Sequence, residues 1–516
     1  MKRIGIDVGG TNTDLVLLEG NEVVQSFKTI TTSDVTSGIK NALFEIVRSV
    51  KSNLGEIDAV MIGTTHFVNA IVQRKNLNRV GALRICLPSC GSLPPFVDWP
   101  KDLAEQVSGE VCLVAGGHEY DGRELVPLDE KSIETAALAM RSKGIRSTAI
   151  SAVFSPLTSE HEERAAKIMC DVYPELQITL SSTLGRIGLL ERENAALLNA
   201  ALVDLADQTF SAFKNALDEF QINAPLFITQ NDGTVVSVER AKNYPILCLA
   251  SGPTNSMRGA AFLSGLSDAI VCDIGGTTTD VGNLRGGFPR QANNVVKLGG
   301  VRTLFRMPDL ISIGLGGGTT AKENPFTLGP QSVGYKLHQK ALVFGGDTLT
   351  LTDVAVASGW IKLGKATFVK NLSSRFLGKV KTEIFKRLYE TIDSMKIDAT
   401  PLPLIVVGGG SMLAPETMGG ISEVVHVQHN EVANAVGAAI AQVSGEIDSI
   451  YRDLSRQEAI TLAEKEARAN AVSAGADNES LIIVELEDLP LAYLPGNALR
   501  IRMRLVGDIK QNQAEA

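Results

Sequence analysis

The chain has 516 residues, of which 44% are hydrophobic and 21% are charged, a composition typical of soluble globular proteins with two or more domains. The formal net charge of -9 argues against nucleic acid as a partner, because phosphate backbones bind basic surfaces. No run of about 18 apolar residues predicts a membrane span, and no apolar leader precedes the first strand, so we expect a cytoplasmic protein without a membrane partner. The six scattered cysteines, without a Cys-x-x-Cys motif, favour free thiols over a metal or redox site.

The first expected elements are three antiparallel strands over residues 2–29, of which the first ends at Asp7. The turn after it has the sequence Asp7-Val8-Gly9-Gly10-Thr11-Asn12-Thr13-Asp14. Paired glycines let backbone N–H groups approach an anion closely, and hydroxyl groups add hydrogen-bond donors. A single turn of this kind fits a phosphate-binding loop and an ordinary β-hairpin equally well.

The next segments alternate between helix and strand, which predicts an α/β fold with a largely buried sheet. Helices are expected over 33–53, 131–143 and 159–171, and strands over 58–63, 80–90 and 147–153. A hairpin is expected over 111–127. We also expect Ser159 and Glu162 to form a reciprocal cap at the start of the third helix.

Two histidines in this half of the chain have an open interpretation. His66 follows a Gly-Thr-Thr turn at a strand end, and it either faces a ligand or packs at the start of a helix, which we favour. His118, Glu119 and Asp121 cluster in a way that suggests a metal site. Since an Asp-Gly turn alone accounts for Asp121, we favour the turn.

The second half begins with a long helix over 191–220, which we expect to link two lobes. Strands over 225–238 and 245–250 and a polar turn over 251–256 precede a helix over 257–263.

Residues 269–283 then repeat the first hairpin. The matching pairs are Asp7/Asp273, Gly9/Gly275, Gly10/Gly276, Thr11/Thr277, Thr13/Thr279 and Asp14/Asp280. Two matched copies at strand ends predict that both turns bind phosphate. A carboxylate at a strand end repels phosphate unless a divalent cation lies between them, and Mg²⁺ suits this role because it binds few carboxylates together with phosphate oxygens and waters.

Further glycine-rich turns end the strands expected within 310–320 and 404–411, at the edge where ligand loops of α/β sheets lie. The second of these turns leaves room for a flat ring against the backbone, although it also fits a tight strand-to-helix turn. The remaining chain predicts helices over 430–444 and 454–476, strands over 481–486 and 499–505, and a disordered end from Lys510.

The order of these motifs resembles the actin, sugar kinase and chaperone-type ATPase superfamily. More narrowly, the chain resembles the ATP-binding subunit of the hydantoinase/oxoprolinase family. The segments that carry the narrower resemblance are 6–14, 63–65, 69–70, 251–253, 273–281, 314–319, 329–330, 352–353 and 431–438.

This resemblance implies an α/β fold with two ribonuclease H-like lobes, mixed sheets and an interlobe nucleotide cleft, plus a small C-terminal α+β unit. The expected ranges are 1–190 and 191–452 for the lobes and 453–516 for the small unit. The implied cofactors are ATP and Mg²⁺, with Asp7 and Asp273 as the catalytic and metal-binding carboxylates. The residues expected to bind the nucleotide are Gly9, Gly10, Thr11, Asn12, Thr13, Gly275, Gly276, Thr277, Thr278, Thr279, Gly408, Gly409, Gly410 and Ser411.

The chain departs from the family pattern in three places. Thr254-Asn255 replaces the usual Ala-Gly, Ser312 replaces a frequent His, and the segment 333–338 replaces one that contains Pro, Gly and Cys. These positions are expected near the place where a substrate is handled.

The family implies an ATP-dependent hydrolase that opens a cyclic amide, such as hydantoin, 5-oxoproline or a related lactam, through phosphorylation of the amide oxygen. The family also implies a second hydantoinase-type subunit, which would take part in the attack of water. Whether the chain forms a homo-oligomer is left open. Two alternatives remain. One is a small-molecule kinase of the same fold, for which no general base is evident, and the other is a non-catalytic ATP-dependent switch or assembly protein, which the three departures mildly favour.

Overall fold

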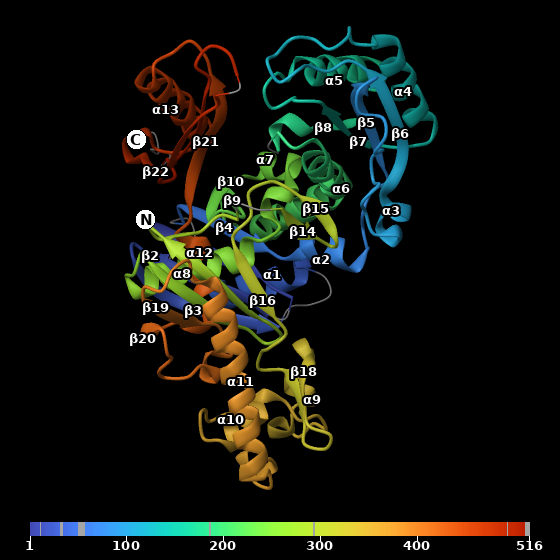
Figure 1. Ribbon diagram of the computed structural model, residues 1–516. Coiled ribbons are helices and arrows are strands. Elements are labelled where there is room, and N and C mark those ends of the chain that lie inside the picture. Colours follow the sequence, from blue (N-terminus) through green and yellow to red (C-terminus); the bar gives the residue numbers. More distant parts are fainter. Residues whose placement is uncertain are drawn as a thin grey trace.

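The computed structural model describes residues 1–10, 12–30, 35–49, 57–184, 187–292, 295–492 and 494–510. Its largest sheet has nine strands, and both the first and the last strands of the described chain belong to it (Figure 1). In spatial order these are β22 (Ile482–Pro490), β23 (Leu499–Gly507), β21 (Gln442–Tyr451), β10 (Thr234–Ser237), β9 (Leu226–Thr229), β4 (Ala59–Thr64), β1 (Lys2–Val8), β2 (Asn12–Glu19) and β3 (Glu22–Ile30).

A second sheet carries the repeated hairpin. Its strands, in spatial order, are β13 (Phe288–Pro289), β12 (Thr279–Arg285), β11 (Ala269–Ile274), β19 (Leu402–Val407) and β20 (Ile421–His426), and β16 (Leu310–Ile313) also pairs with β12. The order β3-β2-β1-β4-β9 in the first sheet matches β16-β12-β11-β19-β20 in the second. In both sheets the first two pairings are antiparallel and the last two are parallel. The predicted pair of mixed sheets is therefore confirmed.

Each of these sheets lies between two helices. Along β2, Leu15 and Leu17 contact the core that includes α1 (Val35–Ser49), whereas Val16 and Leu18 contact α12 (Ala433–Ala439). Along β11, alternate residues face α11 (Ser374–Met395) and α8 (Ser251–Ser264) in the same way. This alternation is the two-residue period of a strand that is buried on both faces.

Helices α8 and α12 join the two sheets, because α12 packs on β1 and β2 while α8 packs on β11 and β19. Their backbones approach closely at Gly259, which contacts the carbonyl of Ala433, and at Gly437, which contacts the carbonyl of Asn255. A Cβ at either glycine would lie well inside the van der Waals radius of that carbonyl oxygen. Glycine is thus required at both positions for this helix spacing.

A third sheet, wholly parallel, forms a separate upper unit with the order β6-β5-β7-β8 (Figure 1). Its strands and helices are β5 (Val80–Leu87), α3 (Lys101–Val107), β6 (Ser108–Ala115), α4 (Glu130–Ser142), β7 (Ser147–Ala152), α5 (Glu160–Val172) and β8 (Gln177–Leu180). The long helix α6 (Leu189–Glu219) packs against β7 and β8 and also against α1. It therefore connects the third sheet to the first one. The expectation that it links the two hairpin lobes was wrong, since α8 and α12 do this.

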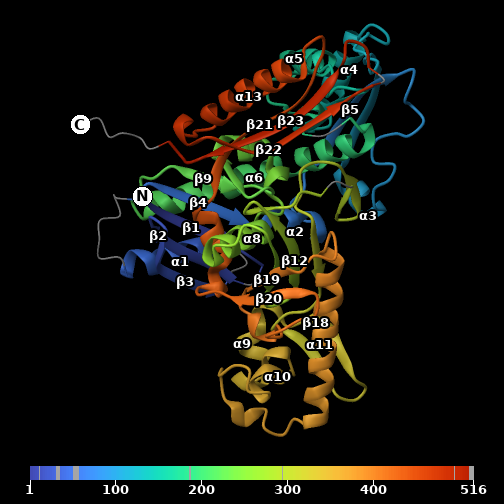
Figure 2. The same cartoon turned by 60° about the vertical axis from the view of Figure 1, so that its left-hand side comes forward.

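The remaining elements surround these sheets, and α10 and α11 form the lower end of the molecule in both ribbon views (Figures 1 and 2). They are α2 (His66–Gln73), α7 (Val238–Asn243), β14 (Val296–Leu298), β15 (Val301–Thr303), β17 (Thr319–Lys322), β18 (Thr327–Ser332), α9 (Leu337–Lys340), α10 (Leu351–Ala357) and α13 (Arg456–Ser473). The hairpin β14–β15 contacts α2 and α6, so this part of the second half lies against the first lobe. Among the residues that the structure describes, no helix is both long and apolar enough to cross a membrane.

The nine-stranded sheet crosses two of the expected domain limits. Strand β9, expected in the second lobe together with β10, pairs with β4 on one side and with β10 on the other, and the C-terminal strands β22 and β23 extend the same sheet through β21. The join between β10 and β21 is short, with only the pairs Thr234–Gln442 and Val235–Val443 in register. Helix α13 covers the C-terminal strands with alanines at four-residue spacing, namely Ala459, Ala463, Ala467 and Ala471.

Several local predictions were wrong for identifiable reasons. The segment expected as a strand over 245–250 is a 3-10 turn (Pro245–Cys248) that begins with proline, and α8 begins at Ser251 because the polar side chains of its first turn are buried against β4 and the β9–β10 turn. Residues 111–127 hold the parallel strand β6 and only an isolated bridge between His118 and Glu124 in place of a hairpin.

The reciprocal cap expected at the start of α5 is also absent. The Glu162 carboxylate is fully buried and accepts hydrogen bonds from the backbone N–H groups of Ala152 and Ser182, at 2.9 Å each. Ser159 instead donates its hydroxyl to Glu163. The disordered end expected from Lys510 falls almost entirely on residues 511–516, outside the described residues.

The close contact between α8 and α12 predicts that adding one methyl group at Gly437 lowers stability. Gly437→Ala should lower the free energy of unfolding by about 2 to 3 kcal/mol, because its Cβ overlaps a backbone carbonyl that cannot move without shifting α8. Gly378→Ala is the matched control, since Gly378 lies in the exposed part of α11 with open space around its Cβ position, and it should raise stability by up to about 1 kcal/mol. Urea denaturation of the full chain measures both. A G437A protein as stable as G378A would show that the contact between α8 and α12 is loose.

Candidate nucleotide-binding and catalytic site

The two repeated turns have the same backbone geometry. In the first, Asp7 pairs with Asp14 and the N–H of Gly9 donates to the carbonyl of Asn12 at 3.0 Å. In the second, Asp273 pairs with Asp280 and the N–H of Gly275 donates to the carbonyl of Thr278 at 2.9 Å. The sequence repeat is therefore a structural repeat down to the hydrogen bond that closes each turn.

The predicted site residues fall at the ends of five strands. Asp7 and Asp273 lie near the ends of β1 and β11, and Asn12, Thr13 and Thr279 begin the returning strands. Gly9, Gly10, Gly275, Gly276, Thr277 and Thr278 form the turns, and Gly408, Gly409, Gly410 and Ser411 follow β19. Thr11 lies outside the described residues.

Asp7 is held by two asparagines that come from distant parts of the chain. Asn255 on α8 donates its side-chain amide to Oδ1 of Asp7 at 3.2 Å, and Asn434 on α12 donates to Oδ2 at 3.0 Å. Asn434 also donates to Oδ2 of Asp14 at 2.8 Å, and Lys28 lies 2.6 Å from the other oxygen of Asp14. The close packing of α8 and α12 brings both amides to the buried carboxylate.

Burial is the main cause of the raised pKa of the four paired aspartates, and the ammonium group of Lys28 offsets it at Asp14 and Asp273. Burial, followed by the charge of Asp14, raises the pKa of Asp7 to about 6, and Asp273 contributes to this shift. Burial likewise raises the pKa of Asp280 to about 6, with a contribution from Asp273. The pKa of Asp273 is raised by burial and lowered by its hydrogen bond to Ser256. The two hairpins thus place their carboxylates within electrostatic reach of one another.

This excess of buried negative charge fits a divalent cation. Of the two predicted ligands, Asp273 is the more accessible, because Asp7 is 2% exposed and both of its oxygens accept amide hydrogen bonds. Within the described ranges, no three His, Cys, Asp or Glu side chains are gathered around one point as metal ligands. A Mg²⁺ ion here would therefore depend on few carboxylates, with waters and phosphate oxygens completing its shell.

The second hairpin turn is supported by a glycine-rich turn that sequence reasoning did not assign to the site. The N–H groups of Gly317 and Gly318 donate to the carbonyls of Gly275 and Gly276 at 3.0 and 2.7 Å. A side chain at Gly316 would collide with this turn. These two hydrogen bonds fix the backbone of the turn. The hydroxyl of Thr279 is not available to a phosphate, because it is buried and donates to the carbonyl of Leu315.

The turn after β19 lies directly on the second hairpin. Gly410 donates its N–H to the carbonyl of Ile274 at 2.7 Å, and a Cβ at Gly408 would overlap the carboxylate of Asp273. Gly409, by contrast, has open space beside it. Two of the three glycines are therefore needed for close packing, which sets this turn beside the predicted phosphate loop and leaves Gly409 open.

Two of the three departures from the family pattern lie at these carboxylates, and the third lies at the second turn. Asn255 binds Asp7, and Ser312 pairs with Asp280 and hydrogen-bonds its carboxylate. The segment at Gly334 lies against Thr277, and the neighbouring Ser332 donates to the carbonyl of Gly276 at 3.4 Å. Substitutions that looked scattered along the sequence are thus gathered around one site.

The other candidate residues have structural roles. His66 is the first residue of α2, and its N–H donates to the hydroxyl of Thr64, as expected for a packed helix start. Asp121 accepts hydrogen bonds from the backbone N–H and the side chain of Arg123, which agrees with the turn interpretation. All six cysteines are free thiols, as predicted.

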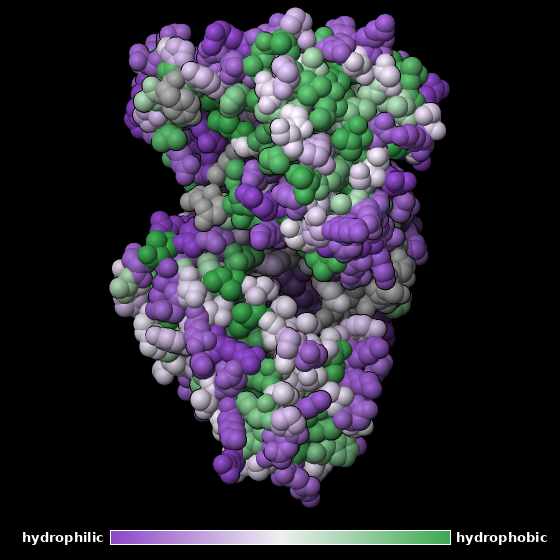
Figure 3. Space-filling view, turned by 45° about the vertical axis from the view of Figure 1, so that its right-hand side comes forward, coloured by the Kyte–Doolittle hydropathy of each residue, from purple (hydrophilic) through white to green (hydrophobic). Residues whose placement is uncertain are grey.

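The surface is hollowed between the upper and lower parts of the molecule, with hydrophilic side chains at the base of the hollow (Figure 3). This hollow lies at the height of α8 and α2 in Figure 1, and α8 carries the amide that binds Asp7.

Two similar mixed sheets, each with a hairpin that carries a carboxylate and paired glycines, define the two-lobed actin-like ATPase fold. The chain belongs to the hydantoinase/oxoprolinase family, whose N-terminal region model matches residues 3–173 and whose hydantoinase/oxoprolinase model matches residues 192–367. The predicted family and fold class are confirmed.

Named relatives support the same assignment. The chain is 27% identical over 398 residues to the caprolactamase subunit alpha of Pseudomonas jessenii, which covers 70% of this chain and 55% of that protein. It is 27% identical over 392 residues to the acetophenone carboxylase gamma subunit of Aromatoleum aromaticum, covering 69% and 53%. The chain therefore spans about half the length of the curated relatives it matches.

A solved structure supports the fold. The ATP-dependent caprolactamase from Pseudomonas jessenii superimposes with a TM-score of 0.77 at 19% identity, covering 98% of this chain and 88% of that chain.

The raised pKa of Asp7 predicts how stability depends on pH in protein without nucleotide or Mg²⁺. Because the pKa of Asp7 is about 6 in the folded chain and about 4 when unfolded, the folded state binds more protons between these values. The free energy of unfolding should therefore fall as pH rises from about 4 to about 6. Asp7→Asn should flatten this fall by on the order of 2 kcal/mol, whereas the residual slope from Asp280 persists.

Urea denaturation at a series of pH values measures this slope. Glu134→Gln, at an exposed carboxylate on α4, is the control and should leave the slope unchanged. An unchanged slope in D7N would mean that Asp7 titrates as an ordinary carboxyl.

Proposed function

We propose that this chain is the ATP-using part of an enzyme that opens a cyclic amide, a lactam or hydantoin ring. The observation that carries the proposal is the pair of matched hairpins, which bring Asp7 and Asp273 within electrostatic reach of each other at one buried site. Membership of the hydantoinase/oxoprolinase family and the likeness to a caprolactamase subunit favour a cyclic amide as the substrate class.

The residues divide into groups by what they offer a nucleotide. The N–H groups of Gly9 and Gly275 close the two turns, so the N–H groups of Gly10 and Gly276, with the hydroxyls of Thr277 and Thr278, bind phosphate oxygens. Gly409 and Ser411 line the adenosine. Asp273, with Asp7 beside it, would hold Mg²⁺, which would supply positive charge to neutralise the phosphates. Asn255 and Asn434 fix the carboxylate of Asp7 in place.

The chemistry follows from the low reactivity of amides. Transfer of the γ-phosphoryl group to the amide oxygen forms a new P–O bond and releases ADP, which turns the amide carbon into an electrophile. Water then adds to this carbon and the ring C–N bond breaks, which leaves an amine and an acyl phosphate. A second water cleaves the acyl phosphate, so that phosphate is released and an amine and a carboxylate remain on one molecule. The task of the protein is mainly to position the reactants and to stabilise charge. Since several relatives are named as subunits, the step that adds water fits a site shared with a second hydantoinase-type subunit.

The first test is ATP turnover by the full chain with Mg²⁺, with and without hydantoin, 5-oxoproline or caprolactam. Substrate-stimulated release of phosphate is expected, together with a ring-opened product. Asp273→Asn should lower the stimulated rate by about 10²- to 10³-fold, because it removes the carboxylate that lies against the phosphate turn.

Asp268→Asn is the matched control, since Asp268 precedes the opposite end of the same strand, β11, and should leave the rate unchanged. A phosphorylated alcohol as the product would identify a kinase. Tight ATP binding without any small-molecule product, both alone and with added hydantoinase-type subunit, would identify a nucleotide-dependent switch. Either result would rule out the proposed hydrolase.

A further inference from the structure

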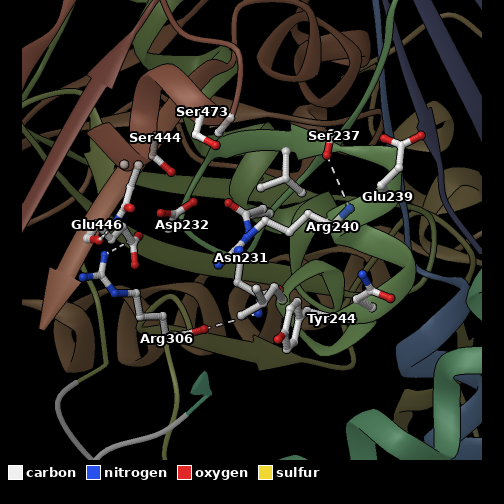
Figure 4. A pocket seen from close by; sticks show the side chains of 17 residues that line it. Asn231, Asp232, Ser237, Glu239, Arg240, Tyr244, Arg306, Ser444, Glu446 and Ser473 are labelled. Atoms are coloured by element: carbon white, nitrogen blue, oxygen red, sulfur yellow. Dashed lines mark hydrogen bonds and ion pairs between the residues drawn. The ribbon is translucent and has the colours of Figure 1, made fainter. Parts of the chain in front are cut away.

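A polar cavity of about 500 Å³ lies outside the nucleotide site, where the C-terminal strands meet the first lobe. The turn after β9, helix α7, strand β21 and the end of α13 form its walls. Figure 4 shows Arg240 and Tyr244 on one side of it, Ser444, Ser473 and Glu446 on the other, and Asp232 between them. Its volume is in the range of small-molecule sites.

Some of the charges in this cavity already have protein partners. Asp232 is buried, lies 2.9 Å from Arg504, and accepts hydrogen bonds from the N–H and hydroxyl of Thr234. Arg306 donates to one oxygen of Glu446 at 2.6 Å and lies 3.6 Å from Glu485. Asp232 and Arg306 therefore build the wall and are not available as the main contacts of a ligand, whereas Glu446 keeps its second carboxylate oxygen.

Two polar groups on opposite walls keep binding capacity toward the cavity. Within the described residues, the guanidinium of Arg240 has no hydrogen bond or ion pair and lies over the ring of Tyr244, 5.4 Å from its centre. On the opposite wall, Glu446 gives one carboxylate oxygen to Arg306 and lies beside the carboxylate of Asp232, and burial, with the charge of Asp232, raises its pKa. The cavity therefore offers an unpaired cation on one side and an incompletely neutralised carboxylate on the other.

We propose that this cavity binds a small amino carboxylate, with the ligand's carboxylate at Arg240 and its ammonium group at Glu446. A guanidinium binds carboxylates through paired N–H donors, and the ring of Tyr244 with Leu247 and Val236 provides an apolar wall for the carbon chain between the charges. The identity of this ligand class rests on the proposed function, because opening of a lactam yields a molecule with one amine and one carboxylate. The cavity is then a site for the product class of the reaction.

The cavity wall is also connected to the nucleotide site. Asn231, in the turn that lines the cavity, accepts a hydrogen bond from the N–H of Ala250 at 2.7 Å, and its carbonyl accepts one from the hydroxyl of Thr254 at 3.0 Å. Both residues are at the start of α8, which carries Asn255 to Asp7. A ligand that fixes the turn thereby fixes the helix that holds Asp7, so a bound amino carboxylate slows ATP turnover.

Calorimetric titration of the full chain tests binding, with 6-aminohexanoate and L-glutamate as probes and hexanoate and hexylamine as single-charge controls. We expect saturable binding of at least one amino carboxylate and weaker binding of both controls. Arg240→Gln should weaken the binding by about tenfold or more, the usual effect of losing a charge-assisted hydrogen bond. Arg141→Gln is the matched control, because Arg141 is an exposed guanidinium over another tyrosine ring, that of Tyr173, far from the cavity.

Absence of saturable binding for both amino carboxylates would overturn the proposal, as would equal binding by hexanoate or an R240Q variant that binds like R141Q. These titrations need no ATP, so they separate this inference from the proposed function. Amino carboxylate binding that is seen in the unmodified chain and lost in R240Q would support the cavity site even if no lactam were hydrolysed. Lactam hydrolysis without amino carboxylate binding would support the proposed function and rule out the cavity as a binding site. Inhibition of ATP turnover by the bound probe, relieved in R240Q, would establish the connection to the nucleotide site, and unaltered turnover at saturation would exclude it.

Discussion

The contact between helices α8 and α12 is the constraint on which the arrangement of the two lobes depends. Each helix is buried against a different sheet, and the two backbones meet at Gly259 and Gly437, where no side chain fits. The same contact supplies the polar part of the site, since Asn255 and Asn434 project from these helices to opposite oxygens of Asp7. Lobe packing and carboxylate positioning are thus two results of one close approach. A change in helix spacing would alter both together.

The internal repeat is symmetric in its backbone and asymmetric in its charges. Lys28 stands opposite Asp14 on the third strand of the first sheet, whereas Ser312 stands opposite Asp280 at the equivalent place in the second. A serine donates one hydrogen bond but brings no positive charge, so the second hairpin keeps an excess of negative charge, which burial makes costly. This hairpin is therefore the one that gains more from a cation. It is also the one that glycine-rich turns surround on two sides.

The hairpins could be predicted from sequence because their signals are local: a strand, a carboxylate, paired glycines and a second strand. The groups that complete the site could not, because they depend on long-range packing or on register. Counting back from the Gly20-Asn21 turn places Phe27 opposite Asp14, but a bulge between Leu17 and Leu18 shifts the pairing by one residue and brings Lys28 there instead. Asn255 was noticed only as a departure from a family pattern, and nothing local links it to Asp7, 248 positions earlier in the chain. Glu162 satisfied the pattern of a helix cap, yet the burial of its carboxylate beneath two backbone N–H groups overrode that local preference.

The short pairing between β10 and β21 gives the largest sheet a seam. Two residue pairs join the C-terminal strands to the rest of the sheet, compared with nine between β21 and β23. Few backbone hydrogen bonds cross this line. The buried ion pair of Arg504 with Asp232, the salt bridge of Arg306 with Glu446 and the apolar cluster that joins Phe227 and Val235 to α13 and β23 hold the two sides together. Amide hydrogens along the seam should accordingly exchange with solvent before those of either flank, and the C-terminal strands with α13 should open as a single cooperative unit.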